Sequence, residues 1–323
     1  MSTAEIVKRP RRWVTAVVWA LVVPVLAWAL LRRSGWEPGF WWGQWVSFTP
    51  YVAAVSLGVV LLALVLRRWP AGTVAIVAAG TLLGAVAPRA LPDTNPLARG
   101  QVLRVLTANL RLGSVPPRAL VDLVRRLHID VLTVQELTPE AAVGLYSAGL
   151  PALLPGSVTY PAPRSHGSGI YARFPLHEGS PIEIGAFRQE QADADLPDGR
   201  SVHIVSVHPC APAQPSMAKC WAAGLRALPA ADGRMRILAG DFNATLDHAG
   251  LRRLLATGYR DAADVTGEGL VSTWPYYGRK AETVPPVTLD HVLADRRIAL
   301  HRFETLALPH TDHRATYTEL ALP

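Results

Sequence analysis

The chain has 323 residues, half of them hydrophobic, and a formal net charge of +7. The basic excess lies in residues 1–100, which hold 10 Lys and Arg against 3 Asp and Glu, whereas residues 101–323 hold 22 against 22. Affinity for duplex nucleic acid comes largely from Lys and Arg that neutralise phosphates, so the balanced second region argues against a general nucleic-acid-binding domain. Its roughly 220 residues are ample for one large core.

Three apolar runs without charged residues occupy much of the first region, at residues 13–31, 46–66 and 71–87. Each approaches or meets the length that crosses a bilayer, so we predict three transmembrane helices. Two further runs follow the first and no clear cleavage site is present, which argues against a cleavable signal peptide. Tryptophans flank the runs as interfacial anchors would, namely Trp36, Trp41, Trp42, Trp45 and Trp69.

Basic residues near the ends of these runs predict their orientation. If the N-terminus is cytoplasmic, six lie inside, namely Lys8, Arg9, Arg11, Arg12, Arg67 and Arg68. Three lie outside, namely Arg32, Arg33 and Arg89. We therefore predict a membrane region at 1–87, a linker at 88–100 and an extracytoplasmic domain at 101–323. The linker reaches at most roughly 40 Å when extended, which keeps the domain close to the lipid surface.

Cys210 and Cys220 are the only cysteines, and both lie in the domain placed outside. A disulfide closing this short loop suits an oxidising compartment, and two unpaired buried thiols explain the sequence equally well. The cysteines and histidines do not have the spacing of a zinc site.

The domain begins with a predicted strand at 102–109, which ends in Asn109, either a turn residue or a site residue. A helix with an apolar face follows from Ser114 to 127. The next apolar strand, 131–134, runs into Gln135 and Glu136. An acid directly after a buried strand is costly unless it is paired or binds a cation, although an exposed strand end would also accommodate it.

A further strand is predicted at 167–176, where Arg173 could meet a phosphate or a neighbouring carboxylate. The strand at 201–207 ends in His208, which alone would more often be structural than catalytic. Residues 216–228 have a helical pattern. The loop at 272–275 carries an aromatic residue, for which core packing is the expected role.

The stretch from Met235 to Ala244 carries the strongest chemical signal. A short apolar strand ends in Ala-Gly, followed by Asp241 and Asn243 two positions apart. Side chains alternate along a strand, so these two point the same way. An acid and an amide in one pocket suit phosphoester hydrolysis, in which one group deprotonates or orients a nucleophile and the other holds phosphoryl oxygens. A Gly-Asp-x-Asn turn is the structural alternative.

The last two predicted strands, 288–294 and 315–320, have polar residues within or before them. Asp290 lies inside the first, where an unpaired carboxylate would be expensive, and His313 precedes the second. Together with the preceding residues they form seven motifs in order, namely Asn109, Gln135-Glu136, the strand 169–175, His208, the stretch 240–243, Leu289-Asp290-His291 and Thr311-Asp312-His313.

In this order the motifs resemble the endonuclease/exonuclease/phosphatase superfamily, which includes deoxyribonuclease I, abasic-site endonucleases, inositol polyphosphate phosphatases and bacterial sphingomyelinases. The resemblance covers about residues 102–320. Thr311 departs slightly from the pattern, because Ser is commoner before Asp-His. With three membrane helices ahead of the domain, the chain resembles the actinobacterial teicoplanin-resistance membrane proteins of this superfamily.

The resemblance implies an α/β fold, a four-layer α/β sandwich with its site at one edge. Glu136 would bind Mg²⁺, with Mn²⁺ as an alternative, and Asn109 and Asp312 would lie near the metal or its waters. Asp241 would activate or orient water, and Asn243 would hold the phosphoryl group. His208 and His313 would contact the phosphate, and Asp290 would orient His313. The general base is either Asp241 or the His313 and Asp290 pair.

The leading hypothesis is therefore a metal-dependent phosphoesterase anchored in the membrane, acting outside on a lipid-linked phosphate or pyrophosphate such as an undecaprenyl carrier intermediate. Such an activity would serve cell-envelope metabolism or glycopeptide resistance. The alternatives are a surface nuclease and a phospholipid headgroup phosphodiesterase. A non-catalytic binding protein on the same scaffold would be indicated by the loss of motif residues, and none is lost.

Overall fold

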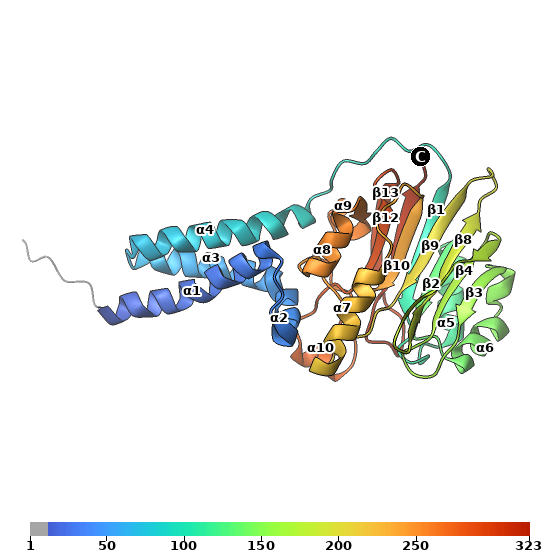
Figure 1. The fold of residues 1–323 in the computed structure, drawn as a ribbon, viewed down its shortest axis with the longest axis horizontal. Coiled ribbons are helices and arrows are strands. Elements are labelled where there is room, and N and C mark those ends of the chain that lie inside the picture. The colour runs from blue at the N-terminus through green and yellow to red at the C-terminus, as the bar shows by residue number, and fades with distance from the viewer. Residues whose placement is uncertain (1–11) are drawn as a thin grey trace, which may run out of the picture. The chain divides into compact units, whose positions relative to one another are not determined.

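The apolar runs near the N-terminus form helices in the computed structural model, which describes residues 12–323 (Figure 1). Their bounds are α1 Arg12–Ser34, α2 Gly39–Trp45, α3 Thr49–Val65 and α4 Trp69–Val86. Three stretches are long and apolar enough to cross a membrane, as predicted, namely Arg12–Ser34, Gly39–Val65 and Trp69–Ala90. Lys8, Arg9 and Arg11, which contribute to the predicted orientation, lie outside the described residues.

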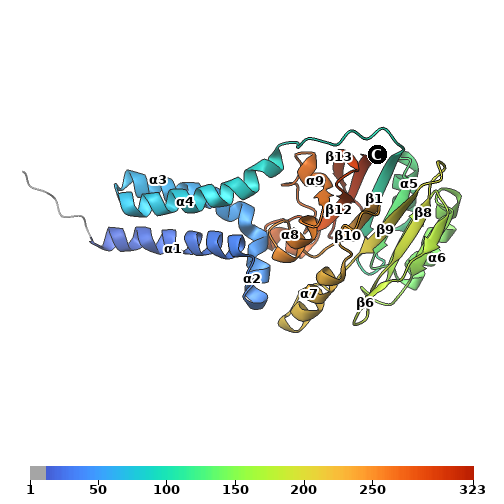
Figure 2. The ribbon, with the colours of Figure 1, turned by 45° about the horizontal axis from the view of Figure 1, so that its top comes forward.

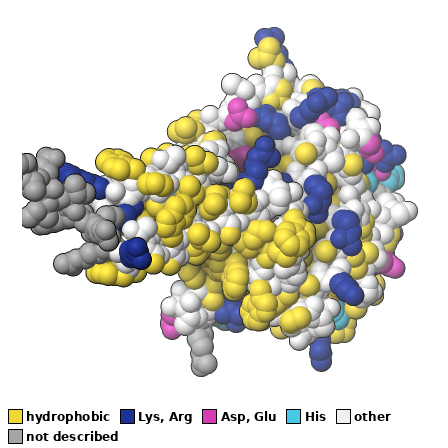
Figure 3. Space-filling view, turned by 60° about the vertical axis from the view of Figure 1, so that its left-hand side comes forward, with side chains coloured by type: hydrophobic (Ala, Val, Ile, Leu, Met, Phe, Trp, Pro, Cys, Tyr) yellow, Lys and Arg dark blue, Asp and Glu magenta, His cyan; other side chains and the backbone are white. Residues whose placement is uncertain are grey.

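The membrane region buries small side chains and exposes large apolar ones. Ala63 and Ala75 are almost fully buried between the helices. Val55, Leu61 and Val65 are instead 64%, 63% and 68% exposed. Hydrophobic side chains cover much of this region's visible surface in Figure 3. An apolar outer surface with all backbone groups paired in helices suits lipid rather than water.

The chain divides into two compact units, the first formed by residues up to 37 with 48–87, and the second by 38–47 with 88–323. Residues 88–100, predicted as a linker, thus contact the second unit. Within it, Nδ2 of Asn95 donates to the Leu300 carbonyl oxygen at 2.7 Å. In the sequence, α3 and α4 separate 38–47 from 88–323, so both segments would lie on the same side of a bilayer if both helices cross it.

Two mixed six-stranded sheets form the centre of the second unit (Figure 1). The first has the order β13-β14-β1-β2-β4-β3, with bounds Ala299–Leu306, Ala315–Ala321, Val102–Asn109, Val131–Gln135, Ser168–Ala172 and Gly156–Tyr160. The second has the order β11-β12-β10-β9-β8-β5, with bounds Tyr259–Asp261, Asp290–Asp295, Arg236–Asp241, Ser201–Val207, Gln191–Asp195 and Leu176–Glu178. A separate hairpin joins β6, Ile182–Ile184, to β7, Phe187–Gln189.

Helices cover the outer faces of both sheets (Figures 1 and 2). On the first sheet these are α5 Pro117–Arg126 and α6 Pro139–Ser147, and on the second they are α7 Ala218–Ala227 and α8 Ala249–Leu255. Two short helices are α9 Ala262–Val265 and α10 Arg279–Thr283, and 3-10 turns occupy Val46–Phe48, Ala87–Ala90, Leu150–Ala152 and Pro215–Met217. Helix, sheet, sheet and helix make four layers, which confirms the predicted α/β sandwich.

The core between the sheets is built from alternate residues of each strand. Val105 and Val131 of the first sheet pack with Ile204 and Ile237 of the second, and all four are fully buried. The intervening residues of these strands pack outward against the helices, as Leu106 does. Strands buried on both faces require mostly apolar sequence, which explains why apolar residues dominate these strands.

Strand register brings the polar ends of the central strands to one edge. In the first sheet, β1 and β2 are parallel and pair Asn109 with Gln135, so both strands end at the same level. In the second sheet, β10 and β12 are antiparallel and pair Asp241 with Asp290. A residue at the end of one strand therefore lies opposite one at the start of the other. Buried polar bonds hold the two sheets together beneath this edge, among them Nε2 of Gln135 to Oγ of Ser206 at 3.3 Å.

The two cysteines, for which the sequence left two states open, are joined. Cys210 and Cys220 form a disulfide with 5.8 Å between their Cα atoms. This bond ties the loop after β9 to α7.

Candidate active site

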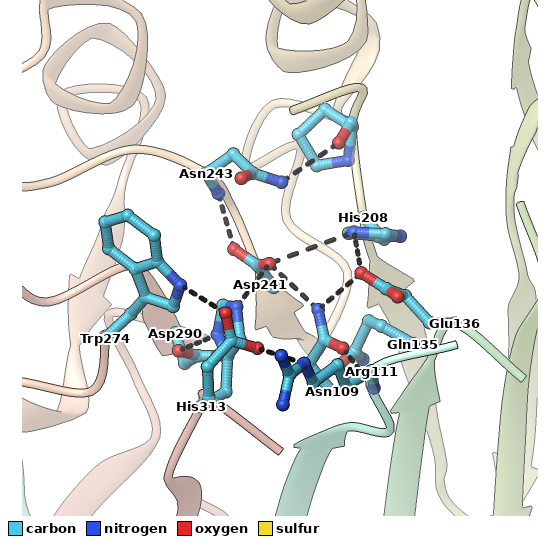
Figure 4. A network of polar contacts seen from close by, with 12 residues as sticks. Asn109, Arg111, Gln135, Glu136, His208, Asp241, Asn243, Trp274, Asp290 and His313 are labelled. Atoms are coloured by element: carbon cyan, nitrogen blue, oxygen red, sulfur yellow. Dashed lines mark hydrogen bonds and ion pairs between the residues drawn. The ribbon is translucent and has the colours of Figure 1, made fainter. Parts of the chain in front are cut away.

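Glu136 follows β2 and directs its carboxylate toward the end of β1 (Figure 4). Its Oε1 accepts from Nδ2 of Asn109 at 3.2 Å, and its Oε2 accepts from the N–H of Leu112 at 2.7 Å. Oδ1 of Asn109 accepts from the N–H of Arg111 at 2.8 Å, which turns the amide nitrogen toward the carboxylates. Glu136 has a φ of 57°, a left-handed conformation that is uncommon for Glu and that these contacts maintain.

Asp241, the last residue of β10, lies at the centre of the cluster (Figure 4). Its Oδ2 accepts from the same Nδ2 of Asn109 at 3.1 Å. This oxygen also lies 3.8 Å from Nε2 of His208 and 3.7 Å from Nε2 of His313. Oδ1 accepts from the N–H of Asn243 at 2.8 Å. One buried carboxylate thus faces an amide and two imidazoles.

Asn243 is held by the turn that the Gly-Asp-x-Asn stretch forms. Its φ is 49°, which Asn tolerates better than most residues, and its Nδ2 donates to the Pro209 carbonyl oxygen at 3.2 Å. Gly240 is required by packing, because a Cβ there would lie 2.0 Å from the Val207 carbonyl oxygen. The turn and the polar site, weighed as alternatives from the sequence, are therefore the same structure.

His313 and Asp290 form the pair that the sequence resemblance implied. Nδ1 of His313 lies 2.9 Å from Oδ2 of Asp290, and both side chains are buried. The backbone N–H of His313 donates to Oγ1 of Thr311 at 3.2 Å, and that hydroxyl donates to the Asn109 carbonyl oxygen at 3.0 Å. The pair therefore joins a loop before β14 to the start of β12.

His208 follows β9 and lies on the opposite side of Asp241 from His313 (Figure 4). Its Nε2 is 3.9 Å from Oε1 of Glu136, beyond hydrogen-bond distance. Its backbone N–H donates to Oε1 of Gln189 at 3.1 Å, which fixes the residue's position. Among the described residues, its buried Nδ1 has no hydrogen-bond partner. An imidazole this close to two carboxylates, yet not bonded to either, leaves room for a bound group.

Asp312 lies at the rim and contacts two residues that the sequence did not single out as site residues. Its Oδ2 accepts from Nε1 of Trp274 at 3.1 Å, and its Oδ1 lies 3.5 Å from Nε of Arg111. Core packing was expected for Trp274, but its indole N–H instead points into the polar network (Figure 4). A polar atom at the end of an aromatic side chain was the available signal.

Burial and neighbouring charges shift the pKa values of two groups at the centre of the site, Asp241 and His313. Burial raises the pKa of Asp241, and the Asp290 carboxylate adds to the rise, while His313 and His208 oppose it. Burial lowers the pKa of His313, but the carboxylates of Asp290 and Asp241 more than offset this and raise it to about 10. The site therefore places a cationic imidazole beside a carboxylate of increased proton affinity.

The donor set fits a hard divalent cation. Oε1 of Glu136 and Oδ2 of Asp241 contact one amide nitrogen and face the same imidazole nitrogen, so the two carboxylates converge on one point. Oxygen donors of this kind suit Mg²⁺ or Mn²⁺. Asp241, Asp290 and His313 also offer ligand atoms within 4.8 Å of one another. In that second group, however, His313 already bonds Asp290, so the Glu136 side is the better position.

This arrangement refines the ligand set expected from the sequence. Asn109 presents its amide nitrogen and therefore orients Glu136 and Asp241, while its oxygen accepts from a backbone N–H. Both oxygens of Asp312 face other side chains. A bound cation would supply charge neutralisation for phosphoryl oxygens and would lower the pKa of a water molecule.

Arg173, the tentative substrate contact, lies at the other end of the first sheet. It follows β4, which runs antiparallel to β2, so that Ala172 pairs with Val131 at the start of β2. Its Nε lies 3.2 Å from Oδ1 of Asp130, and its Nη2 donates to the Ile129 carbonyl oxygen at 3.2 Å. Of the two roles considered for Arg173, the structure therefore shows the pairing with a neighbouring carboxylate, Asp130. The other predicted residues lie at the edge shown in Figure 4, and Asp312 contacts Trp274 and Arg111 there.

The comparisons with known proteins agree with this site. A model of the endonuclease/exonuclease/phosphatase family matches residues 106–313. The chain belongs to this family. The match includes every residue of the candidate site, from Asn109 to His313. Members of the family are phosphoesterases that generally use divalent metal ions, and this chain retains the acid and histidine residues that such chemistry requires. No curated protein matches the sequence.

Solved structures share the fold at low identity. A family protein from Beutenbergia cavernae has 17% identity and a TM-score of 0.52, with 69% of this chain and 72% of that one covered. Humanized D. rerio TDP2 has 16% identity and a TM-score of 0.54, covering 68% and 98%. A mannosyl-6-phosphatase from Bacteroides thetaiotaomicron has 16% identity and a TM-score of 0.52, covering 68% and 100%. At these identities the likeness establishes the fold.

Proposed function

We propose that this family member hydrolyses a lipid-linked phosphate or pyrophosphate, such as an undecaprenyl carrier intermediate, at the outer face of the membrane and with Mg²⁺ as cofactor. One observation carries the proposal: a hydrolase site with its acids, amides and histidines in contact occurs in the same chain as three helices apolar enough to cross a membrane. A site tethered to the bilayer meets lipid substrates at high effective concentration.

The geometry supports a division of roles at phosphorus. Asp241, with its increased proton affinity, accepts a proton from the attacking water. Cationic His313 and neighbouring His208 donate hydrogen bonds to phosphoryl oxygens, and Asn243 adds an amide donor. Glu136 would hold the cation, which would supply charge neutralisation for the phosphoryl oxygens. Asp290 is the positioning residue behind His313.

A panel of phosphate substrates tests the proposal. We expect the full-length protein in detergent to release phosphate from undecaprenyl phosphate or pyrophosphate with Mg²⁺, and to lose this activity in a chelator. Phospholipid headgroup diesters and single-stranded and duplex DNA complete the panel. Release from DNA alone would establish the surface nuclease, and release only from headgroup diesters would establish a phosphodiesterase. The balanced charge of residues 101–323 is the reason to expect little nuclease activity.

Reporter fusions test the side of the membrane. An alkaline phosphatase fused after Gly100 should be active and a fluorescent protein there should be dark, because the count of basic residues places the domain outside. Fusions after Arg68, between the second and third spans, are the matched control and should give the opposite pair of signals. A reversed pattern at both positions would refute the outer-leaflet substrate. An outer site would suit cell-envelope metabolism or glycopeptide resistance, as the resemblance to teicoplanin-resistance proteins implies.

A further inference from the structure

Helix α2 connects α1 to α3. It nevertheless belongs to the second unit, the catalytic unit, which carries the candidate active site. Trp42 and Gly43 are buried, and Gly43 lies against the indole of Trp221, to which a Cβ on Gly43 would come within 3.8 Å. Nε2 of Gln44 donates to the Pro212 carbonyl oxygen at 2.8 Å. Pro212 lies in the loop after β9, which also carries His208. The segment that connects α1 to α3 thus contacts a loop of the candidate active site.

The same helix holds the loop after β10, residues 242–248, which carries Asn243. Nδ1 of His248 accepts from the N–H of Thr245 at 2.8 Å, so its other ring nitrogen bears the proton. That Nε2 donates to the Gly43 carbonyl oxygen at 2.7 Å. His248 is 1% exposed. Water does not reach this buried bond. The position of the His248 ring is therefore fixed by α2 and by the loop itself.

A third anchor comes from Arg89, in the 3-10 turn Ala87–Ala90 that follows α4. Nη1 and Nη2 of Arg89 donate to Oδ2 and Oδ1 of Asp247 at 2.9 and 2.7 Å. Their side chains are 7% and 0% exposed. A two-pronged pair between planar groups fixes direction as well as distance, and a buried partner cannot be removed without leaving an uncompensated charge.

We propose that residues 38–47 and Arg89 form a loop clamp, which holds the loops of His208 and Asn243 in the geometry that hydrolysis requires. The two loops are themselves joined by the bond from Asn243 to the Pro209 carbonyl oxygen, so a shift in one moves the other. The clamp rests on the proposed hydrolase function of this site. Gln44 and Arg89 of the clamp, and their neighbours Asp247 and His248 in the clamped loop, act through other residues and are positioning residues. The segments that connect the membrane helices thereby control the catalytic geometry.

The Asp247→Asn variant of the full-length protein in detergent tests the clamp. With bis(p-nitrophenyl) phosphate and Mg²⁺ we expect kcat to fall about tenfold or more, since small displacements of a catalytic group have effects of this size, and KM to change little. Deuterium uptake of peptides covering 242–248 should rise. The matched control is Asp295→Asn, which removes a buried carboxylate from another two-pronged Arg pair, with Arg297, and should change neither quantity.

A double-mutant cycle separates positioning from general support. If Asp247 acts through the loop of Asn243, Asp247→Asn should have little further effect on kcat in an Asn243→Ala background. Losses that multiply, or unchanged deuterium uptake in 242–248, would overturn the clamp. Should Asp247→Asn not fold, Gln44→Leu carries the test, with a smaller loss of kcat and increased uptake in the loop after β9. A wild-type protein inactive on every phosphate substrate would refute the proposed function, whereas the exchange data would still decide the clamp.

Discussion

The Glu136→Gln variant should fold normally and lose hydrolysis by roughly 10³-fold or more, because the cation site loses its central negative charge. The amide keeps the size of the carboxylate, but both carboxylate oxygens now accept hydrogen bonds, from Asn109 and from Leu112. An NH₂ group must replace one of these acceptors, and it cannot accept. We expect kcat/KM to collapse and Mg²⁺ affinity, measured by calorimetry, to fall with it.

Asp130→Asn is the matched control for this prediction. Asp130 is a buried carboxylate at the opposite end of the same strand, where it accepts from the backbone N–H of Arg104. Removing its charge should lower the unfolding temperature by a few degrees at most and leave kcat/KM unchanged. If Glu136→Gln kept both rate and metal affinity, the cation would bind elsewhere, and the group formed by Asp241, Asp290 and His313 would become the candidate.

Much of the fold could be predicted because the buried strands have a simple physical signature. The runs at 102–109 and 201–207 coincide with β1 and β9, since strands covered on both faces are mostly apolar. Edge strands carry no such requirement. β3 buries only one of its five residues, and β5 is three residues long, so neither was predicted. The helix expected from Ser114 begins at Pro117 instead, because Pro116 serves as its N-cap.

The site could be predicted from strand ends, because each polar residue there follows an apolar run that fixes its level in the sheet. The contact of His313 with Asp290 is long-range, and the family resemblance was what implied it. Arg173 was misplaced for the same reason. It ends a strand as the site residues do, but β4 runs antiparallel to β2, so its end lies at the opposite edge. Strand direction is a property of the whole sheet and is not encoded locally.

The loop clamp was not predicted because its residues have individually ordinary explanations. Trp42 was assigned to the membrane interface, and its burial in the catalytic unit removes it from that role. Arg89 was counted as one basic residue outside the membrane, whereas its guanidinium is almost wholly buried. Position along the chain gives no sign of either tertiary contact.

The paired mutation of His313 and Asp290 should show that the two act as one unit. His313→Ala and Asp290→Ala are each expected to reduce kcat by on the order of 10²-fold or more, since loss of a general acid-base group or its partner has effects of that size. The double variant should be little worse than His313→Ala, because Asp290 is 2.9 Å from the imidazole and reaches the substrate only through it.

The pair His203 and Asp193 provides the control for this cycle. Its atoms are also 2.9 Å apart, but it joins β9 to β8 far from the strand ends that carry the site. Its variants should affect stability and leave kcat unchanged. Multiplicative losses for His313 and Asp290 would mean that the carboxylate acts independently, most directly by binding the cation with Asp241, whose paired strand position places it opposite. Non-additive losses assign it instead to holding His313 as a cation that points at the phosphoryl group, the form that its raised pKa of about 10 favours.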